Sequence, residues 1–432
     1  MILQITFLII SATAITLFSL NVRKIIRNIK LGKGLDRSDK PAERMATMLK
    51  VAFGQSKMTK KPIAAILHLF VYLGFIIINL EVLEIIIDGL LGTHRVFAQP
   101  LGLVYNLLIA SFEILAALVL IGVFAFYARR NILKIKRFTG VEMSSWPRSD
   151  ANIILIVEVL LMSAFLFMNA ADQKLQQLGA AHYISAGAFP VSSLLLPLLP
   201  DSESSLILIE RFCWWFHIIG IFGFLNYLPY SKHLHIVMAF PNTWYSNLDS
   251  KGKFSNMASV SNEVKAMLDP SYVPEPVAEG SRFGAKDVHD LTWKSLMDAY
   301  TCTECGRCTS ACPANQTGKL LSPRKIMMDT RDRLVEVGTN IDKHGKDHQD
   351  GKSLLDNYIS REEIWACTTC NACTDACPVN IDPLAIIIEL RRFAVMEEAQ
   401  APASINNMFS NVENNGAPWK YSPADRANWA QL

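Results

Sequence analysis

Eight of the nine cysteines in this 432-residue chain fall into two runs with the same spacing. Each run reads C-x2-C-x2-C-x3-C and is followed by a proline. The first cysteine run is Cys302, Cys305, Cys308 and Cys312, and the second cysteine run is Cys367, Cys370, Cys373 and Cys377. This spacing is typical of chains that bind two 4Fe-4S clusters, in which the fourth cysteine of each run ligates the cluster of the other run.

The crossed arrangement predicts two sets of ligands. One cluster would be held by Cys302, Cys305, Cys308 and Cys377, and the other by Cys367, Cys370, Cys373 and Cys312. Two zinc sites are the alternative, but zinc ribbons pair two C-x2-C knuckles and use neither the third cysteine nor the proline. Gly306 and Asn371 suit the tight turns, because both residue types accept a positive φ. Cysteines at metal-ligand spacing also indicate a reducing compartment.

Three histidines lie in or beside long apolar segments, where an ionisable side chain is a candidate functional group. His68 falls early in the second such segment. His217 and His235 are 18 residues apart, so on one continuous helix they would share a face with a rise of about 27 Å between them. His233 would then point nearly the opposite way. Because imidazoles on facing helices bind heme iron, we expect heme b between His68 and His235.

A second heme would use His217 as a ligand. The position where a facing ligand is expected holds Glu81 instead, and the loop histidines His94 and His182 could substitute for it. The alternative interpretations are that His235 marks the membrane boundary and that His217 forms a hydrogen bond inside the bundle.

Carboxylates also occur in the apolar segments, where they are costly unless they are paired or hydrated. They are Glu81, Glu84, Glu113 and Glu158. They could serve as proton acceptors for quinone chemistry or as partners in structural ion pairs. Cys213, the ninth cysteine, is interpreted as a small buried hydrophobic residue.

Five apolar segments must position these groups, and each approaches the roughly 20 residues that span a bilayer. They are residues 2–22, 62–87, 104–127, 152–171 and 206–230. The connections 23–61 and 128–150 carry twelve and six Lys or Arg, whereas 88–103 and 172–205 carry one each. The positive-inside rule therefore predicts an N-terminus outside and a C-terminal half in the cytoplasm. We expect a multi-pass protein of the bacterial inner membrane, surrounded by membrane lipid.

The predicted fold is mainly α: a five-helix transmembrane bundle followed by an all-helical dicluster ferredoxin domain. The expected parts are a cytochrome b-like membrane domain (1–240), a connector (241–290), a 4Fe-4S dicluster domain (291–398) and a loop-rich, partner-docking tail (399–432). A helix is expected over 322–337, and an amphipathic helix over 41–57 would lie on the membrane surface or pack on protein. A net charge of only +3 argues against a nucleic-acid partner.

The segment Leu228-Pro-Tyr-Ser-Lys-His-Leu-His235, with His217 and His68, resembles a known family. By these residues the chain is similar to the heterodisulfide-reductase-related membrane iron-sulfur oxidoreductases, which have a nitrate-reductase-gamma-like cytochrome b domain. The resemblance implies heme b at these histidines and a quinone site nearby. Residues 407–419 are similar to the stretch that in related proteins leads into repeated Cys-Cys-Gly motifs. No such motif occurs in this sequence, so the resemblance implies a separate cysteine-rich iron-sulfur subunit.

Two functions are compatible with these features. The first is a quinone-linked oxidoreductase subunit that transfers electrons, in either direction, between a cytoplasmic redox partner or flavoprotein donor and membrane quinone. The alternative is a redox-sensing or assembly protein that is merely anchored by its helices. Histidines within the membrane favour the first, because an anchor needs no heme ligands. The sequence has no dinucleotide-binding fingerprint and no nucleophile-base set, so cofactors would carry the reaction.

Overall fold

The computed structural model describes residues 1–274 and 282–431. The chain divides into two compact units. Unit 1 comprises Met1–Arg27, Met45–Trp244 and Tyr300–Gly306, and unit 2 comprises Asn28–Arg44, Tyr245–Ala299 and Arg307–Leu432. Within the described residues the regular elements are helices, and β-pairing is confined to isolated bridges. The predicted mainly α fold is confirmed.

Among the described residues, five helices are long and apolar enough to cross a membrane, as predicted. They are α1 (Ile2–Ile29), α3 (Pro62–Leu91), α5 (Leu103–Tyr127), α6 (Trp146–Leu178) and α7 (Glu203–Tyr227). Several extend past their predicted ends. The apolar pattern stops at the first charges, whereas backbone hydrogen bonding continues through basic residues such as Arg23 and Arg27 of α1. Long basic side chains at a helix end can reach the polar interface. By this composition the chain is a membrane protein.

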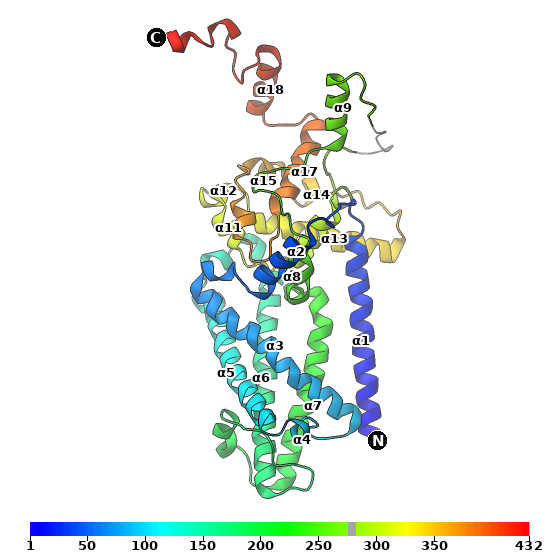
Figure 1. Cartoon of the computed structure of the whole chain (residues 1–432), viewed down its shortest axis with the longest axis vertical. Helices are drawn as coiled ribbons and strands as arrows, with labels where there is room; N and C mark the ends of the chain where they lie inside the picture. The colour runs from blue at the N-terminus through cyan, green and yellow to red at the C-terminus, as the bar shows by residue number, and fades with distance from the viewer. Residues whose placement is uncertain (275–281, 432) are drawn as a thin grey trace. The chain divides into compact units, whose positions relative to one another are not determined.

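The interior of the helix bundle, which Figure 1 draws as ribbons, is filled by apolar side chains. α6 packs along α7 and α5, and α5 packs along α3. Ile109, Phe165 and Ile218, one each from α5, α6 and α7, are fully buried. Phe7 of α1 lies 5.6 Å from Trp214 of α7, measured between ring centroids. Many leucines and isoleucines point outward, as expected for helices that are apolar all round and lie in lipid.

The helix that carries His217 ends at Tyr227 and does not continue to His235. Two 3-10 turns follow, Leu228–Tyr230 and Lys232–Leu234, before α8 (His235–Trp244) begins. Pro229 lies at the break and has no N–H to donate to the helix. Ser231 is extended, with φ −114° and ψ 151°. The prediction that His217 and His235 share one face of a continuous helix is therefore wrong.

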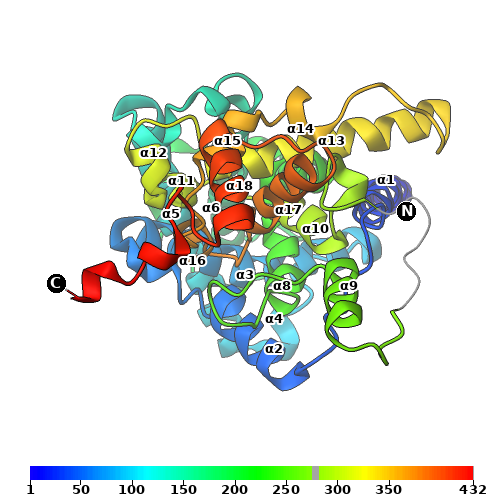
Figure 2. The same cartoon turned by 90° about the horizontal axis from the view of Figure 1, so that it is seen from above.

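Short helices surround the cysteine runs. They are α10 (Trp293–Thr301), α11 (Arg307–Ala311), α12 (Pro313–Gln316), α13 (Pro323–His344), α14 (Leu354–Asn357), α15 (Arg361–Ala366), α16 (Ala372–Ala376) and α17 (Pro383–Met396). In unit 2, α13 packs against α17 and α11 packs against α16 (Figure 2). The helix predicted over 322–337 is confirmed and extends to His344. The hydroxyl of Ser322 caps its first turn by accepting from the Lys325 N–H.

Three other predicted segments differ in part from the structure. The connector contains a helix, α9 (Ala258–Leu268), while residues 275–281, with Pro276, lie outside the described residues. Residues 41–57 are helical only in part, as α2 (Pro41–Met48) and a π-turn (Leu49–Phe53). The tail was expected to be loop-rich but contains α18 (Ala403–Asn415), which Pro402 precedes and Gly416, at φ 62°, terminates.

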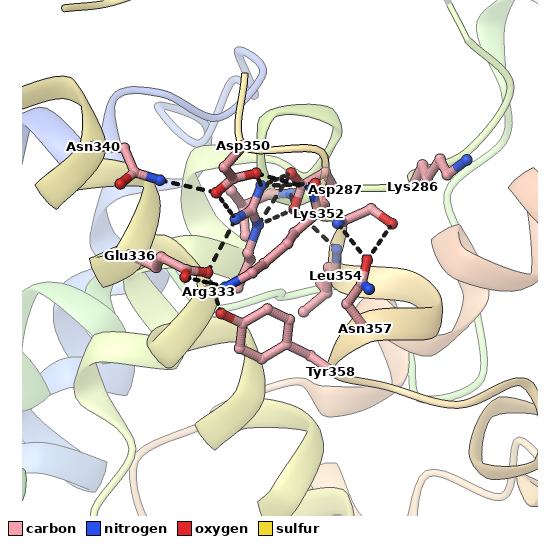
Figure 3. Close-up of polar contacts among 12 residues, drawn as sticks. Lys286, Asp287, Arg333, Glu336, Asn340, Asp350, Lys352, Leu354, Asn357 and Tyr358 are labelled. Carbon is pink, nitrogen blue, oxygen red and sulfur yellow. Dashed lines mark hydrogen bonds and ion pairs between the residues drawn. The ribbon is translucent and has the colours of Figure 1, made fainter. Parts of the chain in front are cut away.

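A buried arginine fastens α13 to two other segments of unit 2 (Figure 3). The Arg333 side chain is 4% exposed. Its Nη2 lies 2.7 Å from Asp287 Oδ2, its Nη1 lies 2.6 Å from Asp350 Oδ2, and its Nη2 also donates to the Lys352 carbonyl at 2.9 Å. Asp287 in turn accepts from the Leu354 N–H. The hydrogen bonds from Arg333 lower the pKa of Asp350 to about 2, so this carboxylate stays ionised at neutral pH.

We predict that Arg333→Met destabilises unit 2 by about 3–5 kcal/mol, because it leaves two carboxylates without their buried cation. Thermal unfolding of the detergent-solubilised chain, followed by circular dichroism, should show the lower melting temperature. Lys343→Met removes the same charge from an exposed position of α13 and should change stability by no more than about 0.5 kcal/mol. Equal melting temperatures for the two variants would contradict the assigned role.

Candidate electron-transfer centres

The two cysteine loops have the same backbone pattern. The residue two after the first cysteine has a positive φ in both, 53° at Glu304 and 56° at Thr369. The residue four after it does so too, 69° at Gly306 and 60° at Asn371. Left-handed residues turn successive N–H groups toward one concave side, a geometry that many iron-sulfur sites use. The predicted turn role of Gly306 and Asn371 agrees with these values.

Backbone N–H groups point at cysteine sulfurs in the second cysteine run. Thr369 N lies 3.4 Å from Cys367 Sγ, and Ile381 N lies 3.3 Å from Cys377 Sγ. Such hydrogen bonds stabilise electron density on the sulfur and are one of the factors that set a cluster's reduction potential. The loop therefore presents its sulfurs as hydrogen-bonded acceptors, which suits thiolate ligands.

The fourth cysteine of the first run lies with the second run. Cys312 is near enough to Cys367 to act on it: burial first, and then Cys312 and Cys370, raise the pKa of the Cys367 thiol. Burial also raises the pKa of Cys373 to about 12. Buried thiols of this kind become thiolates when a metal supplies the positive charge. Iron in this group would thus have the ligand Cys312 that the crossed arrangement predicts.

The other predicted set, with Cys302, Cys305, Cys308 and Cys377, is assigned from the spacing alone. Cys308 lies on α11 and Cys373 on α16, the two helices that pack together. Among the residues that the structure describes, no three His, Cys, Asp or Glu side chains converge closely enough to hold a single metal ion.

Arg391 of α17 supports the start of the second cysteine run, a contact that the sequence did not suggest. Its Nε donates to the Ile364 carbonyl at 2.8 Å, and its Nη2 donates to the Cys367 carbonyl. The guanidinium also lies over the Trp365 ring, 4.9 Å from the centroid. A partly buried cation beside these thiols would help to balance the negative charge of a thiolate-bound cluster.

We predict about eight iron atoms per chain and a second cluster that depends on Cys312. Cys312→Ser should remove the paramagnetic resonance signal of the cluster held by Cys367, Cys370 and Cys373 and keep the other signal. Cys213→Ser is the control, because Cys213 is buried on α7 and its loss should leave the iron content unchanged. Zinc in place of iron, or two intact clusters in the Cys312 variant, would contradict the ligand assignment.

Three histidines gather at the end of unit 1 where α3 begins and α7 ends. The rings of His233 and His235 lie 5.6 Å apart. His68, on α3, is also close to His233: burial, and then the neighbouring His235 and His68, lower the pKa of His233 to about 3. The expectation that His233 points away from His235 depended on a continuous helix and is wrong. The structure therefore offers His233 beside His235 as a partner for His68.

Two of the predicted heme ligands are already oriented through one ring nitrogen. Nδ1 of His235 donates to the Lys232 carbonyl at 3.0 Å, and Nδ1 of His217 donates to the Leu161 carbonyl at 2.9 Å. A carbonyl can only accept, so these bonds fix the tautomer that carries the proton on Nδ1 and leaves Nε2 as the metal-binding atom. Metal-ligating histidines are usually held in this way. The His68 ring stacks on Tyr72, with the centroids 6.4 Å apart.

The other loop histidines lie at the opposite end of unit 1. His94 and His182 are 5.7 Å apart between ring centroids, and His94 Nε2 lies 3.5 Å from Asp172. Burial lowers the pKa of His94 to about 4, so its ring is neutral at physiological pH. His217 is buried in the bundle beside Phe165.

We predict that His68→Ala abolishes the b-type heme absorption of isolated membranes. His235→Ala should do the same if it ligates the iron, and His233→Ala should do so if the neighbouring ring is the ligand instead. The reduced-minus-oxidised spectrum of each variant distinguishes them. Full heme content in both the His68 and the His235 variants would refute the proposed pair. The control His289→Ala alters a histidine of unit 2 and should keep the full heme band.

Ion pairs join the loop of the first cysteine run to this histidine segment within unit 1. The Lys232 ammonium contacts the Glu304 carboxylate and lies 3.7 Å from Asp150 Oδ2. Asp150 accepts from the hydroxyls of Tyr227 and Ser231, at 2.5 and 2.7 Å. All three charged side chains are at least 90% buried. Nothing in the sequence indicated these ion pairs, because their members lie far apart along the chain.

A second buried polar group lies at the end of the bundle formed by the connections 88–103 and 172–205. We call it the Arg95 cluster. The Arg95 guanidinium donates to Asp172 at 2.5 Å, to the Tyr105 hydroxyl at 3.0 Å and to Asn169 Oδ1 at 3.1 Å. The Tyr105 hydroxyl donates to Glu84 at 2.8 Å. In the sequence, the one hint is that Arg95 is the sole basic residue of its connection.

The predicted intramembrane carboxylates have different positions relative to the Arg95 cluster. Glu84 belongs to it, and Glu113 accepts from Asn169 at 3.2 Å. Glu81 is 3% exposed and near enough to Arg95 for electrostatic attraction. Among the described residues, its Oε2 has no hydrogen-bond partner. Glu158 is only half-buried. Glu81 thus has a carboxylate oxygen that accepts no hydrogen bond from the described residues.

Comparison with known proteins identifies the cluster region. Residues 301–381 match a family model described as a 4Fe-4S dicluster domain. The chain is 30% identical to the probable iron-sulfur-binding oxidoreductase FadF of Bacillus subtilis, over 98% of this chain and 60% of that protein. It is 27% identical to the EtfAB:quinone oxidoreductase of Syntrophomonas wolfei, over 92% of this chain and 56% of that protein.

A shorter match covers one component of a larger enzyme. The chain is 33% identical to a subunit of the ferredoxin/F(420)H(2)-dependent CoB-CoM heterodisulfide reductase of Methanosarcina acetivorans, over 24% of this chain and 52% of that protein. No solved structure is significantly similar to the chain. The chain thus spans somewhat more than half the length of the two relatives that match most of it. Together these similarities support an electron-transfer, oxidoreductase role that uses 4Fe-4S clusters.

Proposed function

We propose that the chain relays electrons between a cytoplasmic redox partner and membrane quinone through two 4Fe-4S clusters and heme b. The observation that carries this proposal is the contact between Glu304, within the first cysteine run, and Lys232, the residue before His233. It brings the predicted cluster loop to the segment that carries candidate heme ligands. The relative named as an EtfAB:quinone oxidoreductase supports the choice of quinone as the membrane substrate.

The proposed orientation follows from the basic connections. Residues 23–61 and 128–150 would lie on the cytoplasmic side of a bacterial inner membrane, because their Lys and Arg are retained there. The connections 88–103 and 172–205, with the Arg95 cluster, would face the other side. The clusters then exchange electrons with a cytoplasmic protein, and heme supplies a one-electron carrier within the bundle.

The Arg95 cluster suits the proton side of quinone chemistry. Quinol oxidation releases two electrons and two protons, and the reverse reaction consumes them. Five buried carboxylates, Glu81, Glu84, Asp88, Glu113 and Asp172, lie around Arg95, and Arg211 is a second guanidinium near Asp172, so carboxylates outnumber the cations. Such a group reaches charge balance only by binding protons or other cations. Glu81, whose Oε2 accepts no hydrogen bond from the described residues, is the proposed proton acceptor inside the bundle. His94 lies beside Asp172 of the same group, in the connection 88–103.

The partner is proposed to be an iron-sulfur subunit of the Cys-Cys-Gly type, with a flavoprotein as a further electron donor. A relative that is a subunit of a heterodisulfide reductase supports a multi-subunit assembly. The tail 399–432 is the proposed docking segment. No residue of α18 that the structure describes is buried, and Phe409, Val412 and Trp419 are exposed. Exposed aromatic groups of this kind are common interface anchors.

The relay is tested by reducing the membrane-bound chain with a viologen and then adding a water-soluble quinone. The heme band should be reoxidised within the mixing time, while a chain that is only an anchored sensor would show no quinone-dependent change.

We predict that Glu81→Gln slows quinone turnover by about 10²-fold, because it removes a proton acceptor while keeping the size of the side chain. Heme and cluster content should stay at the wild-type level. The matched control is Glu158→Gln, a half-buried glutamate outside the Arg95 cluster. Wild-type turnover in the Glu81 variant would remove this residue from the proton path without affecting the electron relay.

A further inference from the structure

Glu304 is an unexpected residue for the loop of an iron-sulfur cluster. It lies between Cys302 and Cys305, has a φ of 53° and is 2% exposed. A carboxylate in a buried position is costly unless it is paired. Beside thiolates it also faces like charge, which adds repulsion. A neighbouring cation must therefore offset its charge.

Lys232 supplies that cation. Its side chain is 8% exposed, and its ammonium contacts Glu304, donates to the Pro147 carbonyl at 2.6 Å and lies 3.7 Å from Asp150. The backbone N–H of Lys232 also donates to Asp150, at 3.1 Å. The ammonium is thus held by several acceptors, so it keeps its position when the charge of the loop changes.

Asp150 is the third member of this buried group, and we call Lys232, Glu304 and Asp150 the triad. Asp150 lies in the first turns of α6 and accepts from Tyr227 and Ser231 at the end of α7. The triad therefore connects three parts of unit 1: the start of α6, the break before α8 and the cysteine loop. The break also carries His233 and ends at His235, the candidate heme ligands.

We propose that Lys232 is a positioning residue that holds the first cysteine loop beside the histidine segment, and that the Lys232–Glu304 pair sets the reduction potential of the cluster bound there. This inference rests on the proposed binding of a cluster by the first cysteine run. Reduction adds one electron to the cluster, so the ammonium of Lys232 favours the reduced state and the carboxylate of Glu304 opposes it. Both effects act at short range in a water-poor site, where screening is weak.

The opposite signs of the two charges give a sharp test. Redox titration of the full-length, solubilised chain, monitored by paramagnetic resonance, measures the midpoint potential of each cluster. Lys232→Met should lower the potential of the first cluster, and Glu304→Gln should raise it. The double variant should return toward the wild-type value. A purely structural role predicts damage in the same direction for both single variants, with loss of cluster signal.

Several controls keep the result interpretable. Lys232→Arg retains the charge and should keep the potential near the wild-type value. Lys253→Met removes an exposed lysine of unit 2 and should have no effect. If Lys232→Met fails to accumulate, the double variant still tests the pairing, because replacing both members of a buried ion pair is often tolerated. Restored accumulation and restored potential together would support the proposal.

The positioning role of Lys232 is tested separately, by the rate of heme reduction. After rapid reduction of the clusters by viologen, heme reduction should be several-fold slower in the Lys232→Met chain than in the wild type, at equal heme content. Unchanged potentials in both single variants with intact clusters would overturn the inference and leave the electron relay standing. Absence of the first cluster from the wild-type chain would instead refute the proposed function itself.

Discussion

The backbone cannot continue the hydrogen-bonding ladder of α7 between Tyr227 and His235, and the chemistry at that end of unit 1 depends on this interruption. On an uninterrupted helix, successive side chains are turned by about 100° and point to different surroundings. The extended Ser231 and the following 3-10 turn instead bring His233 next to His235 and direct Lys232 into the protein toward Asp150. One proline-containing break thus assembles imidazoles and a buried cation in the same place.

The two ends of the bundle use buried charge differently. At the Lys232 end, an ammonium lies between two carboxylates, and Asp150 is anchored by further hydrogen bonds, which fixes the charges in space. At the other end, Arg95 is surrounded by more carboxylates than it can neutralise. The first arrangement suits a constant field and the second suits reversible uptake of positive charge. The charged side chains at both ends are buried, so water screens them only weakly.

Local patterns predicted much of this molecule. The five apolar segments and the two cysteine runs were recognisable because span length and metal-ligand spacing are properties of neighbouring residues. Long-range pairing was not recognisable: Arg333 meets Asp287, and Arg95 meets Asp172, across separations that carry no periodic signal. The place of His233 was missed for a related reason, since helical phase is informative only while the helix continues.

The two cysteine loops have residues with positive φ at matching positions, and this affects how the loops fold. Glu304 and Thr369 carry side chains that disfavour their observed φ, at a cost of about 1–3 kcal/mol each. Without metal, the contacts described above that offset this cost are the Lys232–Glu304 pair at the first loop and the Arg391 bonds at the second. Binding of a cluster would add its own stabilisation to these loops, so cluster insertion and local folding are expected to be coupled, as in small metal-binding domains.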